Sequence, residues 1–204
     1  MVFSLLILLT ALACSNSLPF DDNIPQLPVC EKVDQCSCDF IIQPGDVEPI
    51  NLHSLVDGHK PTFETKGKSD KTGLEYTFYY NPCLNFSEYG CKDAGICRTR
   101  LGTKSYNLAN LSTVDFEYQD ATRSVVASYK SKVNDKYITS EVELVCDQSE
   151  YDGKFEFVGN PSELYYKFKL THRCACHGTC PPSSPKLSGG DIPLQLKVER
   201  DCSN

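Results

Sequence analysis

Several features are scarce in this sequence of 204 residues. It has no tryptophan, a single methionine, and, after residue 13, no apolar run near the ~18 residues of a membrane-spanning helix. Its 20 Lys and Arg residues are outnumbered by 27 Asp and Glu residues, which gives a formal net charge of −7. Surfaces that bind nucleic acid or anionic membranes need clustered cations. The composition therefore argues against both as the main partner, and no transmembrane anchor is expected.

Motifs of the common catalytic sites are also missing. The chain contains no Gly-x-Ser-x-Gly, no His-Glu-x-x-His and no phosphate-binding glycine loop. The four histidines, at positions 53, 59, 172 and 177, are scattered, and no pair of carboxylates can be selected as an acid and a base. We therefore expect a protein that is not an enzyme and that requires no cofactor.

Cysteine, in contrast, is abundant, with 12 residues. That usage is typical of an oxidising compartment. Residues 2–13 form an apolar run that is typical of a signal peptide, so we expect residues 1–17 to be removed together with Cys14. The predicted localisation is secreted, or lumenal in the secretory or endolysosomal pathway. The sequons at Asn85 and Asn110 are predicted glycosylation sites in that route.

Hydrophobic periodicity predicts strands. Short β-branched and aromatic runs alternate with a period of two and are separated by turn residues such as Pro44-Gly45 and Asp152-Gly153. Nine strands are predicted, at 38–42, 50–55, 62–66, 74–80, 113–118, 124–129, 137–146, 154–158 and 163–170. The predicted fold class is all-β, an antiparallel sandwich or flattened barrel. We place a leader at 18–35, the β domain at 36–180 and a flexible C-terminal tail at 181–204.

The densest cysteine cluster is Cys174-Ala-Cys176-His177-Gly-Thr-Cys180. Thiolates and an imidazole at this spacing suit a tetrahedral zinc ion, and close cysteines also suit a redox pair. In an oxidising compartment structural disulfides are favoured over both, and no metal site is predicted. Metal or redox chemistry at residues 174–180 stays as an alternative function, and spacing alone does not fix the cysteine connectivity.

Taken in order, the cysteine and strand landmarks resemble the mannose 6-phosphate receptor homology domain. The resemblance covers about residues 36–180. It rests on Cys38 followed by Ile50–Leu55, on Tyr76–Cys83, on Cys91 with Ala94–Cys97, on Val126–Lys130, on Val142–Asp147 and on Tyr165–Cys176. It implies a flattened β-barrel of two roughly orthogonal sheets that is stapled by disulfides.

The resemblance also implies three disulfide pairs, Cys38–Cys83, Cys91–Cys97 and Cys146–Cys176. Five further cysteines lie outside them: Cys30, Cys36, Cys174, Cys180 and Cys202. These would give two extra bridges and one leftover thiol, which is either buried or joins two chains as a disulfide-linked dimer.

Members of this family read a sugar with a Gln, an Arg, a Glu and a Tyr. The matching positions here are Arg98, Ile138, Asn160 and Tyr166, with Glu163 near the third. An isoleucine cannot donate a hydrogen bond, so the resemblance implies the scaffold with a degenerate sugar site unless Arg98 or Lys136 compensates.

Two binding functions follow from that site. The first is a module for a protein or glycoprotein ligand that lacks the usual sugar readers. The second is a lectin for mannose-type glycans with a rearranged site. Whether Arg98, Glu163 and Tyr166 converge on one pocket is a structural check of the second function, and divergence there would remove the argument that Arg98 compensates.

Overall fold

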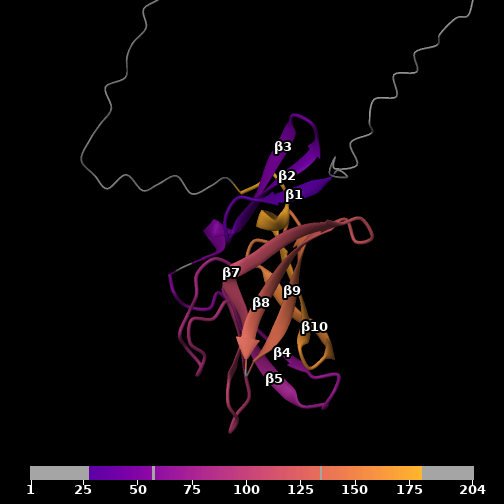
Figure 1. Cartoon of the computed structure of the whole chain (residues 1–204). Helices are drawn as coiled ribbons and strands as arrows, with labels where there is room; N and C mark the ends of the chain where they lie inside the picture. Colours follow the sequence, from indigo (N-terminus) through magenta and orange to yellow (C-terminus); the bar gives the residue numbers. More distant parts are fainter. Residues whose placement is uncertain (1–27, 57, 134, 181–204) are drawn as a thin grey trace, which may run out of the picture.

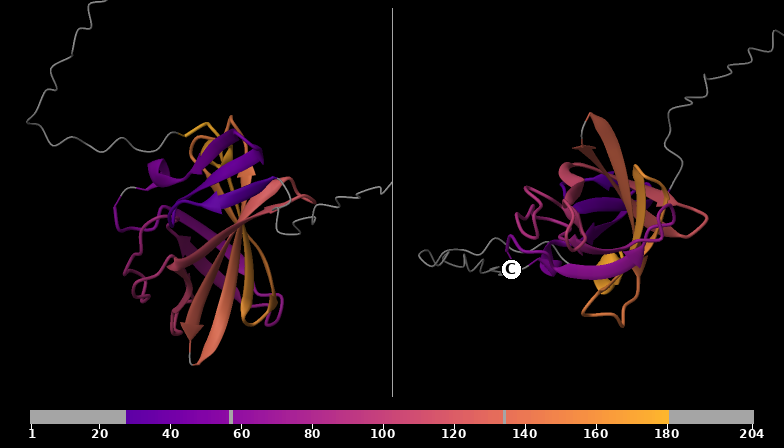
Figure 2. Two further views of the ribbon diagram at one scale, coloured as in Figure 1. Left: turned by 45° about the horizontal axis from the view of Figure 1, so that its top comes forward. Right: turned by 90° about the horizontal axis from the view of Figure 1, so that it is seen from below.

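The computed structural model describes residues 28–56, 58–133 and 135–180, and its architecture confirms the predicted all-β fold class (Figure 1). A three-stranded antiparallel sheet contains β1 (Val29–Lys32), β2 (Ser37–Gln43) and β3 (Asp46–Asn51). An eight-stranded sheet has the order β10-β11-β9-β8-β7-β6-β5-β4 and curls into a nearly closed barrel. Figure 2 shows the small sheet lying across one end of this barrel.

The barrel strands are β4 (Phe63–Lys68), β5 (Glu75–Tyr80), β6 (Ile96–Thr99), β7 (Tyr106–Gln119), β8 (Ser124–Val133), β9 (Lys136–Cys146), β10 (Lys154–Ser162) and β11 (Tyr165–His172). Two three-residue 3₁₀ turns complete the described elements, η1 (His53–Leu55) and η2 (Arg173–Ala175). No helix in the described part of the chain is long and apolar enough to cross a membrane. The predicted signal peptide, the tail at 181–204, Cys14 and Cys202 lie outside the described residues.

The first strand begins earlier in the sequence than the predicted start of the β domain at residue 36. Residues 29–32, which we placed in the leader, form β1 and pair with β2 in the register Cys30↔Phe40 and Lys32↔Cys38. The strand predicted at 50–55 lies earlier in the chain, because β3 ends at Asn51. Its first two residues end β3, and its last three form η1, where the Asn51 side chain accepts a hydrogen bond from the His53 backbone N–H at 2.9 Å.

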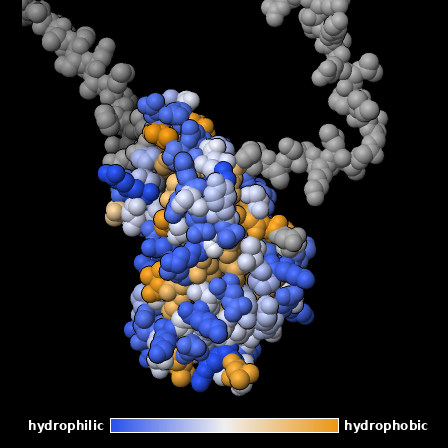
Figure 3. All heavy atoms as spheres, turned by 180° about the vertical axis from the view of Figure 1, so that it is seen from behind, coloured by the Kyte–Doolittle hydropathy of each residue, from blue (hydrophilic) through white to orange (hydrophobic). Residues whose placement is uncertain are grey.

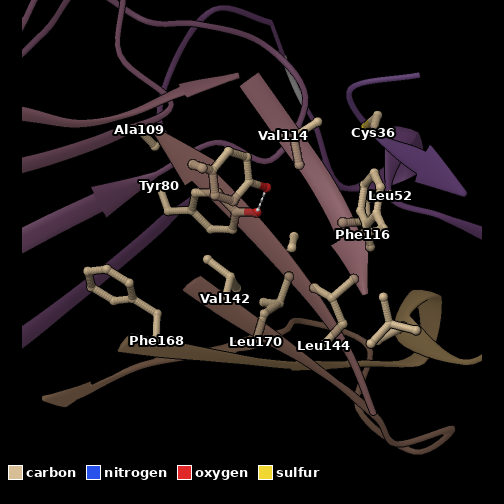
Figure 4. Packing of buried hydrophobic residues seen from close by; sticks show 14 of the residues in the cluster. Cys36, Leu52, Tyr80, Ala109, Val114, Phe116, Val142, Leu144, Phe168 and Leu170 are labelled. Carbon is tan, nitrogen blue, oxygen red and sulfur yellow. Dashed lines mark hydrogen bonds between the residues drawn. The ribbon is translucent and has the colours of Figure 1, made fainter. Parts of the chain in front are cut away.

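Alternating side chains of the barrel strands fill one interior. Its largest fully buried members are aromatic and branched residues, several of which are drawn in Figure 4. Tyr80 and Tyr129 are 0% exposed, and their hydroxyl groups form a hydrogen bond of 2.9 Å. Phe155 stacks on Tyr80 with centroids 5.0 Å apart and on Phe168 with centroids 5.2 Å apart. Packing in this interior removes apolar surface from contact with water, and this burial stabilises the fold.

Strand β7, with 14 residues, pairs with a different neighbour along each of its two halves. Its first half pairs with β6, and its second half pairs with β8, with a wide bulge between the pairs Asn110↔Lys130 and Asp115↔Ser128. In the bulge the Thr113 hydroxyl takes the place of a backbone partner. Its single proton lies between the Asn110 carbonyl at 2.7 Å and the Lys130 carbonyl at 2.9 Å, and its oxygen accepts from the Lys130 N–H at 2.8 Å. A bulge of this kind lets a strand bend through the corner of a barrel.

The barrel closes where β10 lies alongside β4. Gly67 allows this approach, because a Cβ there would lie 2.1 Å from Cδ1 of Phe157. One strand pair departs from the antiparallel prediction. β11 returns between β10 and β9 and runs parallel to β9, from Tyr165↔Thr139 to His172↔Cys146. The sequence pattern gave no sign of this pair, since alternation is the same in parallel and antiparallel strands.

Five disulfides connect the ten described cysteines. Cys91–Cys97 and Cys146–Cys176 confirm two of the pairs that the resemblance implied. The expected Cys38–Cys83 pair is wrong, because Cys38 bonds Cys30 and Cys83 bonds Cys36. The physical reason is β1, which brings Cys30 beside Cys38 in the first hairpin. Among the described bridges, Cys174–Cys180 is the one formed wholly by the cysteines that lay outside the implied pairs, because Cys30 and Cys36 bond Cys38 and Cys83 instead.

Candidate functional site

The connecting loops at one end of the barrel surround a polar cavity of about 350 Å³. Residues of the β4–β5 and β10–β11 connections line it, together with side chains from β5, β6, β7, β8, β9, β10 and β11 near the same end of the barrel. All four sequence-predicted site residues, Arg98, Asn160, Glu163 and Tyr166, lie in its wall. The convergence that would favour a rearranged sugar site is therefore present.

Arg98 is held in a cage of three tyrosines. Its guanidinium carbon lies 4.6 Å from the ring centroid of Tyr76, 4.7 Å from that of Tyr106 and 5.6 Å from that of Tyr166. Cation–π attraction fixes the planar group there without a carboxylate partner. Strand register explains the cage, because Arg98 pairs directly with Tyr106 and its other neighbour, Phe78, is two residues from Tyr76.

Arg98 retains hydrogen-bonding capacity inside the cage. Nη1 donates to the Tyr166 hydroxyl, whereas Nε is buried and has no partner within the described part of the chain. A buried N–H that stays unpaired costs ~1–3 kcal/mol, which a bound ligand or water would remove. The site therefore presents a cationic donor that is fixed in place and incompletely satisfied.

Tyr166 lies at the floor of the cavity and is 2% exposed. Burial raises the pKa of its hydroxyl, and the adjacent Arg98 guanidinium opposes part of that rise. The hydroxyl consequently stays protonated at neutral pH. Because it accepts from Arg98, its own O–H remains available as a donor.

Asn160 is 2% exposed and is locked by a reciprocal pair of hydrogen bonds with the β4–β5 turn. Its side-chain Oδ1 accepts from the Asp70 N–H at 2.8 Å, and its backbone N–H donates to Asp70 Oδ2 at 2.7 Å. Gly159 permits this contact, because a Cβ there would lie 2.7 Å from Asp70 Oδ2. With Oδ1 occupied, the Asn160 amide nitrogen is the group left for a ligand.

The remaining wall supplies charge of both signs. Glu163 contributes an exposed carboxylate, while Lys71 of the β4–β5 connection and Lys136 at the start of β9 contribute ammonium groups. Ile138 is 5% exposed and also lines the cavity. Arg98 and Lys136, the two cations considered above as compensation for it, lie in the same wall.

Sequence reasoning missed the tyrosine cage. Tyr76 and Tyr106 belong to predicted or overlooked strands that read as core, and nothing in the sequence marks them as partners of Arg98. Arg98 and Tyr106 face each other because β6 and β7 form a hairpin. β6 was not predicted, so this pair could not be found; a prediction of the hairpin would have found it. Lys71 was missed because loop residues carry no periodicity.

The cysteine cluster at the far end is not arranged as a metal site. Cys174 bonds Cys180 and Cys176 bonds Cys146, so these sulfurs are disulfides and not thiolate ligands. His177 Nδ1 contacts Glu48 Oε2, and its ring stacks on Phe40 with centroids 5.2 Å apart. Among residues 28–56, 58–133 and 135–180, no group of three or more His, Cys, Asp or Glu side chains is placed to hold a metal ion.

Both predicted glycosylation sites are half-buried. Asn110 lies in β7 at the start of the bulge, and its Oδ1 accepts from the Ser112 N–H at 3.1 Å and from the Ser112 hydroxyl at 2.9 Å. Asn85 follows β5, and its Oδ1 is buried without a partner in the described part of the chain. Glycosylation at either asparagine remains a prediction.

The fold and the convergent cavity fit a binding module of the disulfide-rich, secreted type. No protein-family model matches this sequence, and a search of curated proteins finds no match.

Proposed function

We propose that this protein is a carbohydrate-binding module of the secretory pathway, which holds a hexose of a mannose-type glycan in the cavity at the loop end of the barrel. The observation that carries the proposal is the convergence of Arg98, Asn160, Glu163 and Tyr166 on one polar cavity. It moves our preference away from a protein ligand that is bound without sugar-reading residues. The function is binding and involves no catalysis.

Each wall residue has a role that suits a ring of hydroxyl groups. The Glu163 carboxylate accepts from two neighbouring hydroxyls, and the Arg98 guanidinium donates to ring or hydroxyl oxygens. The Tyr166 hydroxyl and the Asn160 amide nitrogen add neutral donors from the buried floor. Arg98, Asn160 and Tyr166 are carried by barrel strands, and Glu163 lies in the short connection between two of them. The barrel therefore preserves the geometry that distinguishes one hydroxyl configuration from another.

A glycan array with the disulfide-intact protein tests this proposal. We expect binding to mannose-type glycans and a loss of at least ~10-fold in affinity for Glu163→Gln and for Arg98→Met, because each removes a charge-assisted hydrogen bond. Glu117→Gln, at an exposed position on β7, is the matched control and should bind as the wild type does.

Two results would overturn the proposal. One is the absence of binding to any glycan on the array. The other is capture of a ligand whose binding survives enzymatic removal of its glycans, which would restore the protein-ligand hypothesis.

A further inference from the structure

The two ends of the barrel carry opposite charge. At the end that holds the cavity, the β4–β5, β6–β7, β8–β9 and β10–β11 connections and the strand ends beside them present six exposed cations against four exposed acids. The cations are Lys68, Lys71, Arg100, Lys104, Lys132 and Lys136, and the acids are Asp70, Glu75, Asp135 and Glu163. Asp70 is bonded to Asn160, and Asp135 pairs with Lys132 at 3.1 Å. This end is therefore cationic in a chain whose net charge is −7.

The opposite end has the reverse balance. Its β2–β3, β3–β4, β5–β6, β7–β8 and β9–β10 connections and the strand ends beside them carry seven acids against four cations among the described residues. The acids are Asp46, Glu88, Asp93, Asp120, Asp147, Glu150 and Asp152, and the cations are Lys60, Lys92, Arg123 and Lys154. A net charge counted over the whole sequence hides this separation. The argument from composition against an anionic membrane therefore does not apply to the cavity end alone.

Apolar side chains project from the same cationic loops. Leu101 stands at the tip of the β6–β7 loop between Arg100 and Gly102 and is fully solvent-exposed, at 102% of its reference area. Tyr137 and Leu164 are 66% and 38% exposed in the β8–β9 and β10–β11 regions. In Figure 3 this lower end shows apolar atoms protruding directly beside strongly hydrophilic ones.

An anionic lipid bilayer is the partner that uses both properties. Each Lys or Arg near an anionic membrane surface contributes ~1 kcal/mol of attraction, and an exposed leucine gains further by entering the apolar layer. A sulfated polysaccharide would use the cations but would leave Leu101 in water. Repulsion of the acidic far end fixes the orientation of the approach.

We propose that the cavity end of the barrel is a docking surface for anionic lipid bilayers, in which the loop cations contact the headgroups and Leu101 inserts between them. The proposal does not rest on the sugar-binding function, because lipids without sugar headgroups suffice to test it.

The absence of tryptophan from the chain makes the test direct. Leu101→Trp introduces a single tryptophan at the loop tip, and Tyr151→Trp places one at the acidic end, where Tyr151 is 65% exposed. With vesicles of phosphatidylcholine and phosphatidylserine, the emission of the first variant should shift to shorter wavelength. The shift should be absent with phosphatidylcholine alone and should be reversed by high salt. The second variant should show no shift.

Vesicle co-sedimentation of the full chain with its native residue at position 101 tests the cations. Lys71→Glu combined with Lys104→Glu should weaken binding by about 100-fold or more, because attraction becomes repulsion at two positions. Lys154→Glu combined with Arg123→Glu makes the same change in net charge away from the cavity end and should have little effect. Three results would each overturn the proposal: no vesicle binding by the wild type, equal shifts for both tryptophans, or binding to a soluble sulfated polysaccharide in place of vesicles.

Discussion

Tyr80 and Tyr129 place two hydroxyl groups in the barrel interior and satisfy them against each other at 2.9 Å (Figure 4). Tyr129→Phe should therefore destabilise the protein by ~1–3 kcal/mol, because Tyr80 loses its partner. Tyr80→Phe combined with Tyr129→Phe should cost less than the sum of the two single changes, since no buried hydroxyl is left unpaired. Urea unfolding of the four proteins measures this coupling, and strictly additive effects would contradict it.

The same pair predicts how stability depends on alkaline pH. Burial raises the pKa of Tyr129 to about 12 and holds the pKa of Tyr80 well above its ordinary value. The unfolded chain, with a tyrosine pKa of ~10, therefore loses its protons first as the pH rises. The contribution is fully present below pH ~10 and is lost as the pH rises through ~12, and it amounts to about 3 kcal/mol for Tyr129 alone.

The free energy of unfolding, measured between these pH values, checks the sign and the size of this loss. The variant with phenylalanine at both positions should lose less stability than the wild type over the same interval. Equal losses in both proteins would assign the alkaline sensitivity to other groups.

Individual site residues were predictable where a landmark in the chain fixed their position. Arg98 follows Cys97 directly, and Tyr166 belongs to a clear alternating run, so both could be assigned by counting. Their environment could not be assigned in the same way. The cage around Arg98 depends on which residues face each other across β5, β6 and β7, and register is a property of paired strands.

At the scale of the element, the bulge in β7 gives the next prediction. Thr113→Val keeps the shape of the side chain but removes both hydrogen bonds to the Lys130 backbone. We expect a loss of ~1–2 kcal/mol in stability and faster hydrogen exchange at the Lys130 amide. Thr113→Ser retains the hydroxyl and is the control. Unchanged exchange at Lys130 in the valine variant would show that the hydroxyl does not replace a strand partner.

Strand predictions succeeded where alternation was long and failed where it was short. The runs at 124–129, 137–146 and 154–158 are confirmed within longer strands, because one face of each packs into the core. β1 and β6 have four residues each, too few for a period of two to stand out from the background. Missing β1 also produced the wrong partner for Cys38, since the cysteine that β1 carries was placed in the leader.

At the scale of the molecule, the disulfides divide by the length of chain they enclose. Cys36–Cys83 closes a separation of 47 residues, and Cys91–Cys97 closes one of 6. In the chain-entropy description, removing the first by Cys36→Ala and Cys83→Ala should cost ~4 kcal/mol, and removing the second with alanines should cost ~2 kcal/mol. Thermal or urea unfolding of the two variants shows which of them loses more stability.

Non-reducing peptide mapping should recover Cys30 joined to Cys38. A peptide that joins Cys38 to Cys83 would contradict the connectivity described above.

The parallel pairing of β11 with β9 has a consequence for how this chain is made. β10 has its ladder with β11, and β9 keeps one edge open until β11 occupies it, so neither strand is completed until the last strand of the domain is present. During synthesis the nascent chain therefore carries an unpaired β9 edge from Cys146 until β11 ends at His172, and such an edge invites pairing with other chains. Completion of the barrel sheet must then be a late event, because the β9–β11 and β10–β11 ladders form only after residues 165–172 have left the ribosome. A chain stopped before that segment would expose the β9 edge permanently, which makes a shortened product a substrate for chaperones and for degradation.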